Sequence, residues 1–251
     1  MYPDSTIQNR RIMSDKPKYK RLLLKVSGEA LLGEQSFGID PAMTAKIASD
    51  IKAAVNMGCE IGVVVGGGNI FRGVALAAKG ADRVTGDHMG ILATTMNALA
   101  LKMAIIDAGL ECVVMNAVDM PKITQTFSQR DLDEHMANGK VVVFAGGIGH
   151  PFFTTDTAAA LRAVEIGADA LFKGTQVDGI YSADPKKDPN AIRFEEISHD
   201  EVISKGLSVM DMAAVSLARD NNIPVVVFSI HSENGLVDIL NGHGHCTIVE
   251  A

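Results

Sequence analysis

The chain has 251 residues, of which 47% are hydrophobic and 21% are charged, and its 23 basic and 30 acidic side chains give a net charge of −7. This balance is typical of a globular protein with a substantial core, and it excludes a collagen-like, a disordered or a small disulfide-stapled chain. The acidic excess disfavours binding to nucleic acid or to an anionic membrane, because both need a basic protein surface.

The three cysteines lie far apart and form no C-x-x-C pair, so neither a disulfide framework nor a thiolate metal site is expected. No stretch approaches the roughly 18–20 consecutive apolar residues of a membrane span, and the N-terminus lacks the apolar part of a signal peptide. We therefore expect a cytoplasmic protein. Residues 1–18 are polar and without periodicity, which predicts a flexible leader followed by a single domain over residues 19–251.

Six short apolar runs recur along the chain and are rich in Val, Ile and Leu. They are continuous rather than alternating, which predicts strands buried on both faces in a parallel sheet with helices on each side. The predicted strands are Arg21–Val26, Glu60–Val65, Glu111–Met115, Lys140–Phe144, Ala168–Phe172 and Pro224–Phe228.

Helical patterns lie between these strands. Asp40 precedes a proline and is a typical N-cap, and Gly58 and Gly109 are typical stops. A third helix has Thr155 or Asp156 as its expected cap. The predicted helices are Pro41–Met57, His88–Ala108, Thr157–Ile166 and Asp211–Asn221.

The alternation of strands and helices predicts an α/β fold with right-handed crossovers. The expected architecture is a three-layer α/β/α sandwich with an open, mainly parallel central sheet.

The predicted helix His88–Ala108 carries apolar residues at alternating spacings of three and four, which makes one apolar face. We favour the interpretation that this face packs on the protein's own core, and a contact with another subunit is the alternative. The residues of this face are Met89, Leu92, Met96, Leu99, Met103 and Ile106.

Glycines and charged residues follow four of the predicted strands. Ligands of open α/β sheets bind beyond the carboxyl ends of the strands, where glycine turns and helix starts can direct N–H groups at phosphate oxygens. These segments predict a phosphate-binding crevice, and the long irregular stretch Asp178–Asn190 is expected to be functional as well. The segments are Lys25–Gly28, Gly66–Asn69, Gly146–Gly149 and Lys173–Thr175.

Neither of the two common nucleotide-binding motifs is complete. Ile39-Asp40 follow Gly33–Gly38 where a P-loop would have Lys-Ser or Lys-Thr, and Phe71 replaces the third glycine of a dinucleotide fingerprint.

The charged residues around the crevice suit phosphoryl transfer, which needs positive charge and positioning more than a covalent nucleophile. Lys25 and Arg72 are candidates for phosphate contacts. Asp87 and Asp156 are candidates for the site or, alternatively, plain N-caps. His88 and His150 lie beside the predicted crevice, and for each of them a substrate contact and a structural role are both possible interpretations.

Six segments between Lys20 and the C-terminus occur in a characteristic order: Lys25–Glu29 (KVSGE), Gly66–Arg72 (GGGNIFR), Gly86–Gly90 (GDHMG), Pro151–Asp156 (PFFTTD), Val177–Pro185 (VDGIYSADP) and Val209–Asp211 (VMD). Together they resemble the bacterial uridylate kinases (UMP kinases), a family of the amino acid kinase superfamily. GDHMG and FFTTD separate these enzymes from relatives that phosphorylate acetylglutamate, aspartate or carbamate.

The resemblance implies transfer of the γ-phosphate of ATP to UMP in pyrimidine nucleotide biosynthesis, with Mg²⁺ bridging the phosphates and no metal ligand directly assigned. It implies that Lys25 stabilises the transferred group, that Asp156 orients Lys25 and the metal waters, and that Asp211 arranges the active site. The implied ATP-binding residues are Lys25, Val26, Ser27, Gly28, Gly68, Arg72, Thr175, Tyr181 and Asp184. The implied UMP-binding residues are Gly67, Asp87, Ile148, Gly149, His150, Pro151, Phe152, Phe153, Thr154 and Thr155.

The resemblance also implies a homohexamer that GTP activates and UTP inhibits. The residues implicated in the response to GTP are Gly33, Glu34, Gln35, Ser36, Phe37 and Gly38. The family pattern usually reads Thr-Gly-Asn-Pro where this chain has Ile148–Pro151, so backbone groups or the His150 side chain are the expected substitutes in reading the base.

Two alternatives remain open at this stage. A non-catalytic nucleotide-binding protein for storage or sensing would share the fold, but it could dispense with Lys25 and Asp156, which this chain has. A dinucleotide-dependent oxidoreductase is disfavoured by the absent third glycine.

Overall fold

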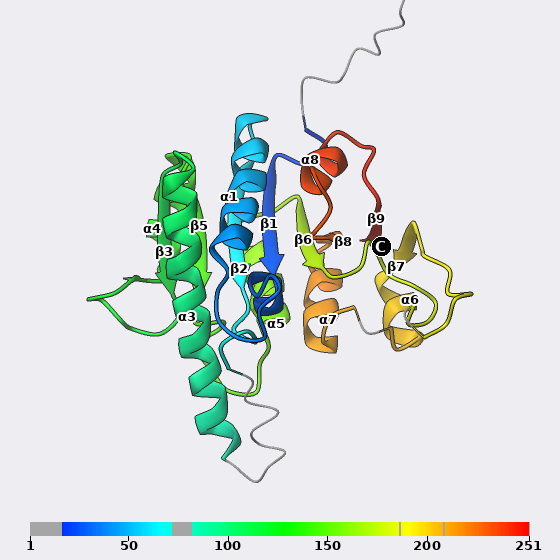
Figure 1. Ribbon diagram of the computed structural model, residues 1–251, viewed down its shortest axis with the longest axis horizontal. Helices are drawn as coiled ribbons and strands as arrows, with labels where there is room; N and C mark the ends of the chain where they lie inside the picture. The colour runs from blue at the N-terminus through cyan, green and yellow to red at the C-terminus, as the bar shows by residue number, and fades with distance from the viewer. Residues whose placement is uncertain (1–16, 72–81, 186, 208, 251) are drawn as a thin grey trace, which may run out of the picture.

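The computed structural model describes residues 17–71, 82–185, 187–207 and 209–250, and in these residues one nine-stranded sheet lies between two layers of helices (Figure 1). The strand order is β4-β3-β5-β2-β1-β6-β8-β9-β7, and neighbouring strands are parallel except for β8 and β9. The strands are β1 (Arg21–Val26), β2 (Glu60–Val65), β3 (Cys112–Asn116), β4 (Gln125–Thr126), β5 (Val141–Ala145), β6 (Ala170–Thr175), β7 (Glu196–Ser198), β8 (Val225–Ser229) and β9 (Cys246–Glu250).

The helices begin at capping side chains in most cases. Asp40, for example, accepts a hydrogen bond from the Ala42 N–H at the start of α1, where Pro41 is the first residue. The helices are η1 (Gly28–Leu31, a 3₁₀ turn), α1 (Pro41–Asn56), α3 (Arg83–Asp107), α4 (Gln129–Ala137), α5 (Thr155–Glu165), α6 (His199–Ser204), α7 (Met212–Asp220) and α8 (Gly235–Leu240).

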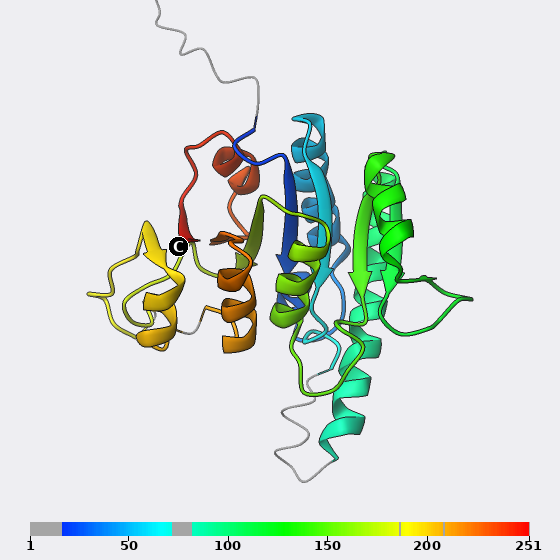
Figure 2. The same ribbon diagram turned by 180° about the vertical axis from the view of Figure 1, so that it is seen from behind.

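The alternation of side chains along the strands builds two cores. Leu22 and Leu24 point to the layer of α1, α3 and α8, which faces the viewer in Figure 1, whereas Leu23 points to the layer of α4, α5 and α7, which Figure 2 shows. Because both faces of the central strands are covered, continuous apolar runs are what this sheet requires. The predicted α/β sandwich with a mainly parallel sheet is therefore confirmed.

The predicted strands β1 and β2 have the observed bounds, and the later strands are shifted. The largest error concerns Ala168–Phe172, since β6 runs from Ala170 to Thr175. Its pairing with β8 continues to Thr175 and Ser229, beyond the polar Lys173 at which the apolar pattern ended. Backbone pairing with a neighbour, which composition does not report, sets the end of this strand.

The prediction of α3 was wrong in two respects. The helix begins at Arg83 rather than His88, with Asp82 as the N-cap that accepts from the Thr85 N–H. The apolar face does not pack on the core: apart from the half-buried Leu99, its residues are 43–67% exposed. The buried side of α3 is instead made of small and polar residues with a few aliphatic ones: Gly86, Ala93, Thr94, Thr95, Asn97, Ala98, Leu101 and Ile105.

By length and composition alone, α3 could also cross a membrane, with 39% of its most apolar window buried inside the molecule. A helix that covers a sheet passes the same test, so this observation is weak evidence for a membrane span.

Several short elements were not predicted, namely η1, β4, α4, β7, α6, α8 and β9. The missed α4 is polar overall and buries only Leu132 and Met136, so its apolar signal is weak. At the other end of the chain, the Lys18 N–H donates to the Leu240 carbonyl at 2.9 Å, so the predicted leader 1–18 touches the domain at Lys18, and residues 1–16 lie outside the described part.

Candidate functional site

Two lysines lie side by side where β1 and β6 end. Lys25 and Lys173 are register partners on these adjacent parallel strands. Each follows by two residues a leucine, Leu23 or Leu171, that packs in the core under α5, so both lysines point to the same face of the sheet. Two ammonium groups in neighbouring register positions repel each other, and this arrangement requires an anion nearby.

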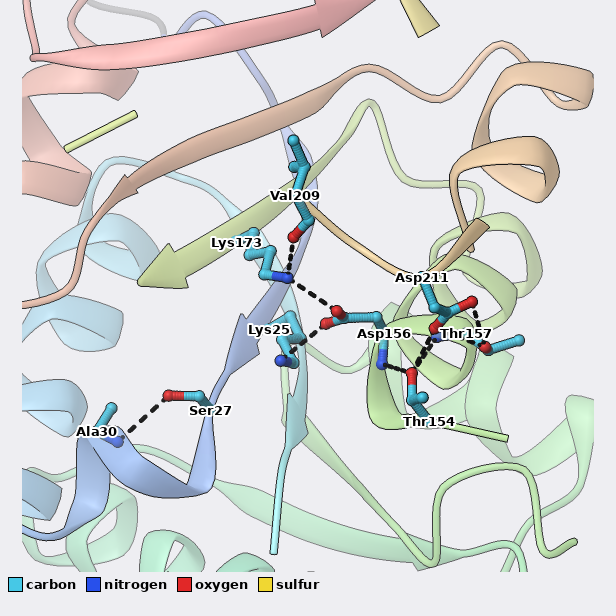
Figure 3. A network of polar contacts seen from close by, with 9 residues as sticks. All are labelled: Lys25, Ser27, Ala30, Thr154, Asp156, Thr157, Lys173, Val209 and Asp211. Atoms are coloured by element: carbon cyan, nitrogen blue, oxygen red, sulfur yellow. Dashed lines mark hydrogen bonds and ion pairs between the residues drawn. The ribbon is translucent and has the colours of Figure 1, made fainter. Parts of the chain in front are cut away.

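Asp156 in the first turn of α5 provides that anion (Figure 3). Its two carboxylate oxygens take one lysine each: Oδ1 lies 2.8 Å from Lys25 Nζ, and Oδ2 lies 2.8 Å from Lys173 Nζ. The three side chains are only 8–16% exposed, so their charges are poorly screened by water. When both lysines are protonated, the cluster carries one net positive charge.

The pKa values of the cluster reflect burial and the ion pairs. Burial has the largest effect on Asp156 and raises its pKa, but the attraction of Lys25 and Lys173 outweighs burial and leaves the pKa below its usual range. Burial also has the largest effect on Lys173 and lowers its pKa, the repulsion from Lys25 adds to that shift, and Asp156 and Asp211 offset it only in part.

Asp211 connects the start of α5 to the segment before α7. It is the N-cap of α7 and accepts from the Ala214 N–H at 2.9 Å. The same carboxylate accepts hydrogen bonds from the hydroxyl groups of Thr154, the N-cap of α5, and Thr157. Two residues before Asp211, the Val209 carbonyl accepts from Lys173 Nζ. Asp211 therefore holds the first turn of α5, and with it Asp156, in place.

The turns after β1 and β2 approach each other closely. A Cβ atom on Gly28 would lie 2.5 Å from the Gly68 nitrogen, and one on Gly66 would lie 2.8 Å from the Gly28 nitrogen. Only glycine fits at these two positions, because larger residues would clash with backbone. Ser27 stabilises the first of these turns, since its Oγ accepts from the Ala30 N–H at 3.3 Å.

A first cavity of about 620 Å³ opens between these turns, α3 and the segment after β5, a size suited to a small-molecule ligand. Seven of the residues predicted to bind UMP line it, together with one predicted for ATP, Gly68. Those seven are Gly67, Asp87, Ile148, His150, Phe153, Thr154 and Thr155.

Asp87 lies at the wall of this cavity, one turn into α3. It forms an ion pair with Arg83 at 2.8 Å and accepts from the Phe152 N–H at 2.8 Å. Phe152 has φ of +72°, which is strained for a side-chain residue, and Arg83 lies 5.7 Å from the centre of its ring. Asp87 and Arg83 therefore hold the segment after β5 against α3. Neither Asp87 nor Asp156 is an N-cap, because Asp82 and Thr154 cap the two helices.

A second cavity of about 680 Å³ lies beyond the end of β6. Thr175, Tyr181 and Asp184, three residues predicted for ATP, line it together with Lys173, Lys205 and Val209. The Tyr181 hydroxyl donates to Asp178 at 2.7 Å, and this bond is the largest cause of the raised pKa of Tyr181. Lys173 borders this cavity and Thr155 borders the first, so the Lys25–Asp156–Lys173 cluster lies at the junction of the two.

Other predicted residues lie outside both cavities. Arg72 is outside the described residues. Gly149 has φ of +83°, and a Cβ atom on it would lie 3.0 Å from the Ala117 carbonyl oxygen. Phe152 is 66% exposed, and Gly149, Pro151 and Phe152 line neither cavity. The segment Gly33–Gly38 lines neither cavity, and Gly38 is hydrogen-bonded to Asn69 at the end of the turn after β2.

Lys173 was predicted only as part of the crevice segment Lys173–Thr175, without a role of its own, and Arg83 was not predicted as a site residue. The signal for Lys173 was present, because a lysine inside an apolar strand pattern is the same feature that drew attention to Lys25. Arg83 carried no such signal, since its contact with Asp87 depends on α3 starting five residues earlier than predicted.

The sequence is similar to known proteins along most of its length. The model of the amino acid kinase family matches residues 20–229. Uridylate kinase of Mesorhizobium japonicum is 65% identical over 237 residues, which cover 94% of this chain and 99% of that protein. Uridylate kinase of Agrobacterium fabrum is 65% identical over 238 residues, which cover 95% and 99%.

Solved structures show the same likeness. The crystal structure of UMP kinase from Bacillus anthracis superimposes with a TM-score of 0.89 and 35% sequence identity, over 92% of this chain and 96% of that one. On the family match, on these relatives and on the fold, the chain belongs to the amino acid kinase family and, within it, to the uridylate kinases, as its six ordered sequence segments indicated.

Proposed function

We propose that this protein is an ATP-dependent UMP kinase that transfers the γ-phosphate of ATP to UMP and releases ADP and UDP. The observation that carries the proposal is the Lys25–Asp156–Lys173 cluster at the junction of two cavities, each large enough for a nucleotide. The names of the relatives, uridylate kinase and UMP kinase, specify the substrate.

In this proposal, the first cavity binds UMP and the second binds ATP. Asp87 is close enough to the first cavity to accept a hydrogen bond from the ribose, and Tyr181 offers the second cavity a ring for stacking on adenine. The donor γ-phosphate and the acceptor phosphate would then meet beside Lys25.

The transfer needs charge and alignment rather than a general base, because the attacking UMP phosphate is already ionised near neutral pH. Lys25 would stabilise the negative charge of the transferred group, and its ammonium is held in a fixed, poorly hydrated position by Asp156. Lys173 shares Asp156 and would add positive charge on the side of ATP. The glycine turns allow the backbone to approach the phosphates closely.

Mg²⁺ is part of the proposal as the ion that neutralises the phosphates. The described residues contain no group of three or more His, Cys, Asp or Glu side chains that could hold a metal by themselves. This fits Mg²⁺, which in kinases is bound mainly by nucleotide phosphates and water with one or two carboxylates. Asp156, which is shared by two lysines, would bind the waters of such an ion in this proposal.

The test is an ADP-release assay with UMP, CMP and acetylglutamate as acceptors in parallel. We expect rapid release with UMP, slower release with CMP and none above background with acetylglutamate. Tight binding of UMP and ATP without ADP release would favour a non-catalytic nucleotide-binding protein. A thermal shift with NADH but not with ATP or UMP would favour an oxidoreductase.

We also propose that the exposed apolar side of α3 is a contact between copies of this chain within a homohexamer. An exposed row of large apolar residues on one helix is unusual on a monomer. Light scattering should give a hexamer for the wild type and smaller species for Met96→Glu/Met103→Glu. Ile192→Glu, which changes an apolar side chain that is 70% exposed elsewhere, should remain hexameric.

Activation by GTP through Gly33–Gly38, inhibition by UTP and a cytoplasmic location complete the proposal. Gly38 supports the first of these, since its backbone N–H and carbonyl both bind Asn69, next to the glycines of the phosphate site. Initial rates with and without each nucleotide at fixed ATP and UMP test the two effects.

A further inference from the structure

Two buried asparagines face each other behind the phosphate site. Asn69 ends the turn Gly66–Asn69 after β2 and is 3% exposed, and Asn97 lies in the middle of α3 and is fully buried. Asn97 Nδ2 donates to Asn69 Oδ1 at 2.6 Å, and Asn69 Nδ2 donates to Asn97 Oδ1 at 3.0 Å. This reciprocal pair uses the donor and the acceptor of both amides and thereby fixes both side chains.

The pair also holds two backbone segments. Asn97 Nδ2 donates to the Gly66 carbonyl at 2.6 Å, and Asn69 Nδ2 donates to the Gly38 carbonyl at 2.9 Å. The backbone N–H of Gly38 returns a bond to the Asn69 carbonyl at 3.2 Å. The two amides and the Gly66 carbonyl are buried, so a movement of the turn that broke these bonds would leave buried polar groups without a hydrogen bond. The intact pair therefore opposes such a movement.

The turn that is held in this way forms the wall of the candidate active site. A Cβ atom on Gly28 would lie 2.6 Å from Asn69 Oδ1, and Gly66 N donates to the Val26 carbonyl at 2.9 Å. Gly67 lines the first cavity. A shift of the Gly66–Asn69 turn would therefore displace the backbone directly after Lys25.

We propose that Asn97 is a positioning residue for phosphoryl transfer, which acts through Asn69 and Gly66 to fix the glycine turn opposite Gly28. The inference rests on the proposed kinase function. Asn97 itself touches neither cavity, so we expect its replacement to act mainly on the alignment of the transferred phosphate and much less on the affinity for UMP.

The test compares Asn97→Ala and Asn69→Ala with Leu101→Ala, one turn further along the buried side of α3. Both asparagine variants should lower kcat about 10- to 100-fold, the range expected for a misaligned reacting group, with KM for UMP within about twofold of the wild type. Leu101→Ala should lower Tm by loss of packing and leave kcat near the wild-type value at temperatures well below unfolding.

The double variant gives an independent readout. If the two amides act as one unit, Asn69→Ala/Asn97→Ala should lose little more activity than either single variant. A loss of kcat no larger than that of Leu101→Ala, a rise in KM for UMP as large as the fall in kcat, or variants that do not fold would overturn the proposal. Absence of ADP release by the wild type would instead refute the kinase function itself.

Discussion

The two cavities are built from different kinds of structure. The first is enclosed by glycine turns at the ends of β2 and β5 and by one side of α3, whereas the second is lined largely by residues 179–185, which have no regular secondary structure beyond a single bridge at Tyr181. The charged cluster lies at their junction and is held by β1, β6 and α5. We therefore expect that a substitution in one cavity changes the KM of one nucleotide and not of the other. A substitution in the cluster should instead lower kcat for the transfer between them.

Replacing Lys25 with methionine should have the largest effect. Met keeps the volume of the aliphatic chain but removes the ammonium, so we expect kcat to fall by about 10³-fold, as for loss of one strong electrostatic contact in a site. UMP binding, measured by calorimetry, should stay nearly intact, because Lys25 lines neither cavity.

Lys173→Met is the matched comparison, since it removes the other partner of Asp156 from the side of the second cavity. We expect it to raise KM for ATP as well as lower kcat. Near-normal turnover of Lys25→Met would refute the role of Lys25 in the transfer. Equal effects of the two variants on kcat and on KM for ATP would show that Lys173 has no separate role on the side of the second cavity.

Asp87→Asn should affect the first cavity alone. Asn can still accept from the Phe152 N–H but loses the charge that pairs with Arg83 and that would strengthen a bond to the ribose. We expect KM for UMP to rise about tenfold, near the lower end of the range for a hydrogen bond to a charged group, and KM for ATP to stay unchanged. An equal rise for both substrates would show that the cavities are not independent.

Tyr181→Ala should affect the second cavity alone and more weakly. Loss of a ring that stacks on a base costs about 1–3 kcal/mol, so KM for ATP should rise at least fivefold while KM for UMP stays constant. Tyr181→Phe is the control, because it removes only the hydrogen bond to Asp178 and should remain within about twofold of the wild type. A large effect of Tyr181→Phe would mean that the Tyr181–Asp178 bond, not the ring, shapes this cavity.

The central strands could be predicted from the sequence because burial on both faces leaves continuous apolar runs such as Arg21–Val26. The glycine-rich segments after these strands could be recognised as one site, because parallel strands place their carboxyl ends at the same edge of the sheet. The exposed face of α3 could not be assigned, because an apolar stripe has the same spacing whether it meets a core or another chain.

Contacts between distant elements were the other limit. The register of β1 with β6, which sets Lys25 beside Lys173, is not written in either strand alone. The Asn69–Asn97 pair joins residues 28 positions apart, and although Asn69 ends the predicted segment Gly66–Asn69, nothing in the sequence indicates that the two side chains meet. Lys25 and Asp156 were candidates from their places after the predicted strands as well as from the family resemblance, and the geometry was needed to show that Lys173 pairs with the same carboxylate.

The smallest expected effect is on folding stability at acid pH. It tests the charged cluster alone, because no nucleotide needs to be bound in either cavity. The pKa of Asp156 is lower in the folded protein than in the unfolded chain, so its ionised form contributes stability above the unfolded pKa of 3.8, and this contribution is lost as the pH falls through the lower folded pKa. Thermal unfolding should therefore show Tm falling more steeply between about pH 5 and pH 3 in the wild type than in Asp156→Asn. Glu111→Gln, which changes an exposed carboxylate paired with Lys140 outside the cluster, serves as the control, because the Asp156 contribution should persist in it. Equal slopes for the wild type and Asp156→Asn would mean that the two ion pairs do not stabilise the fold, and the cluster would then serve catalysis at no gain in stability.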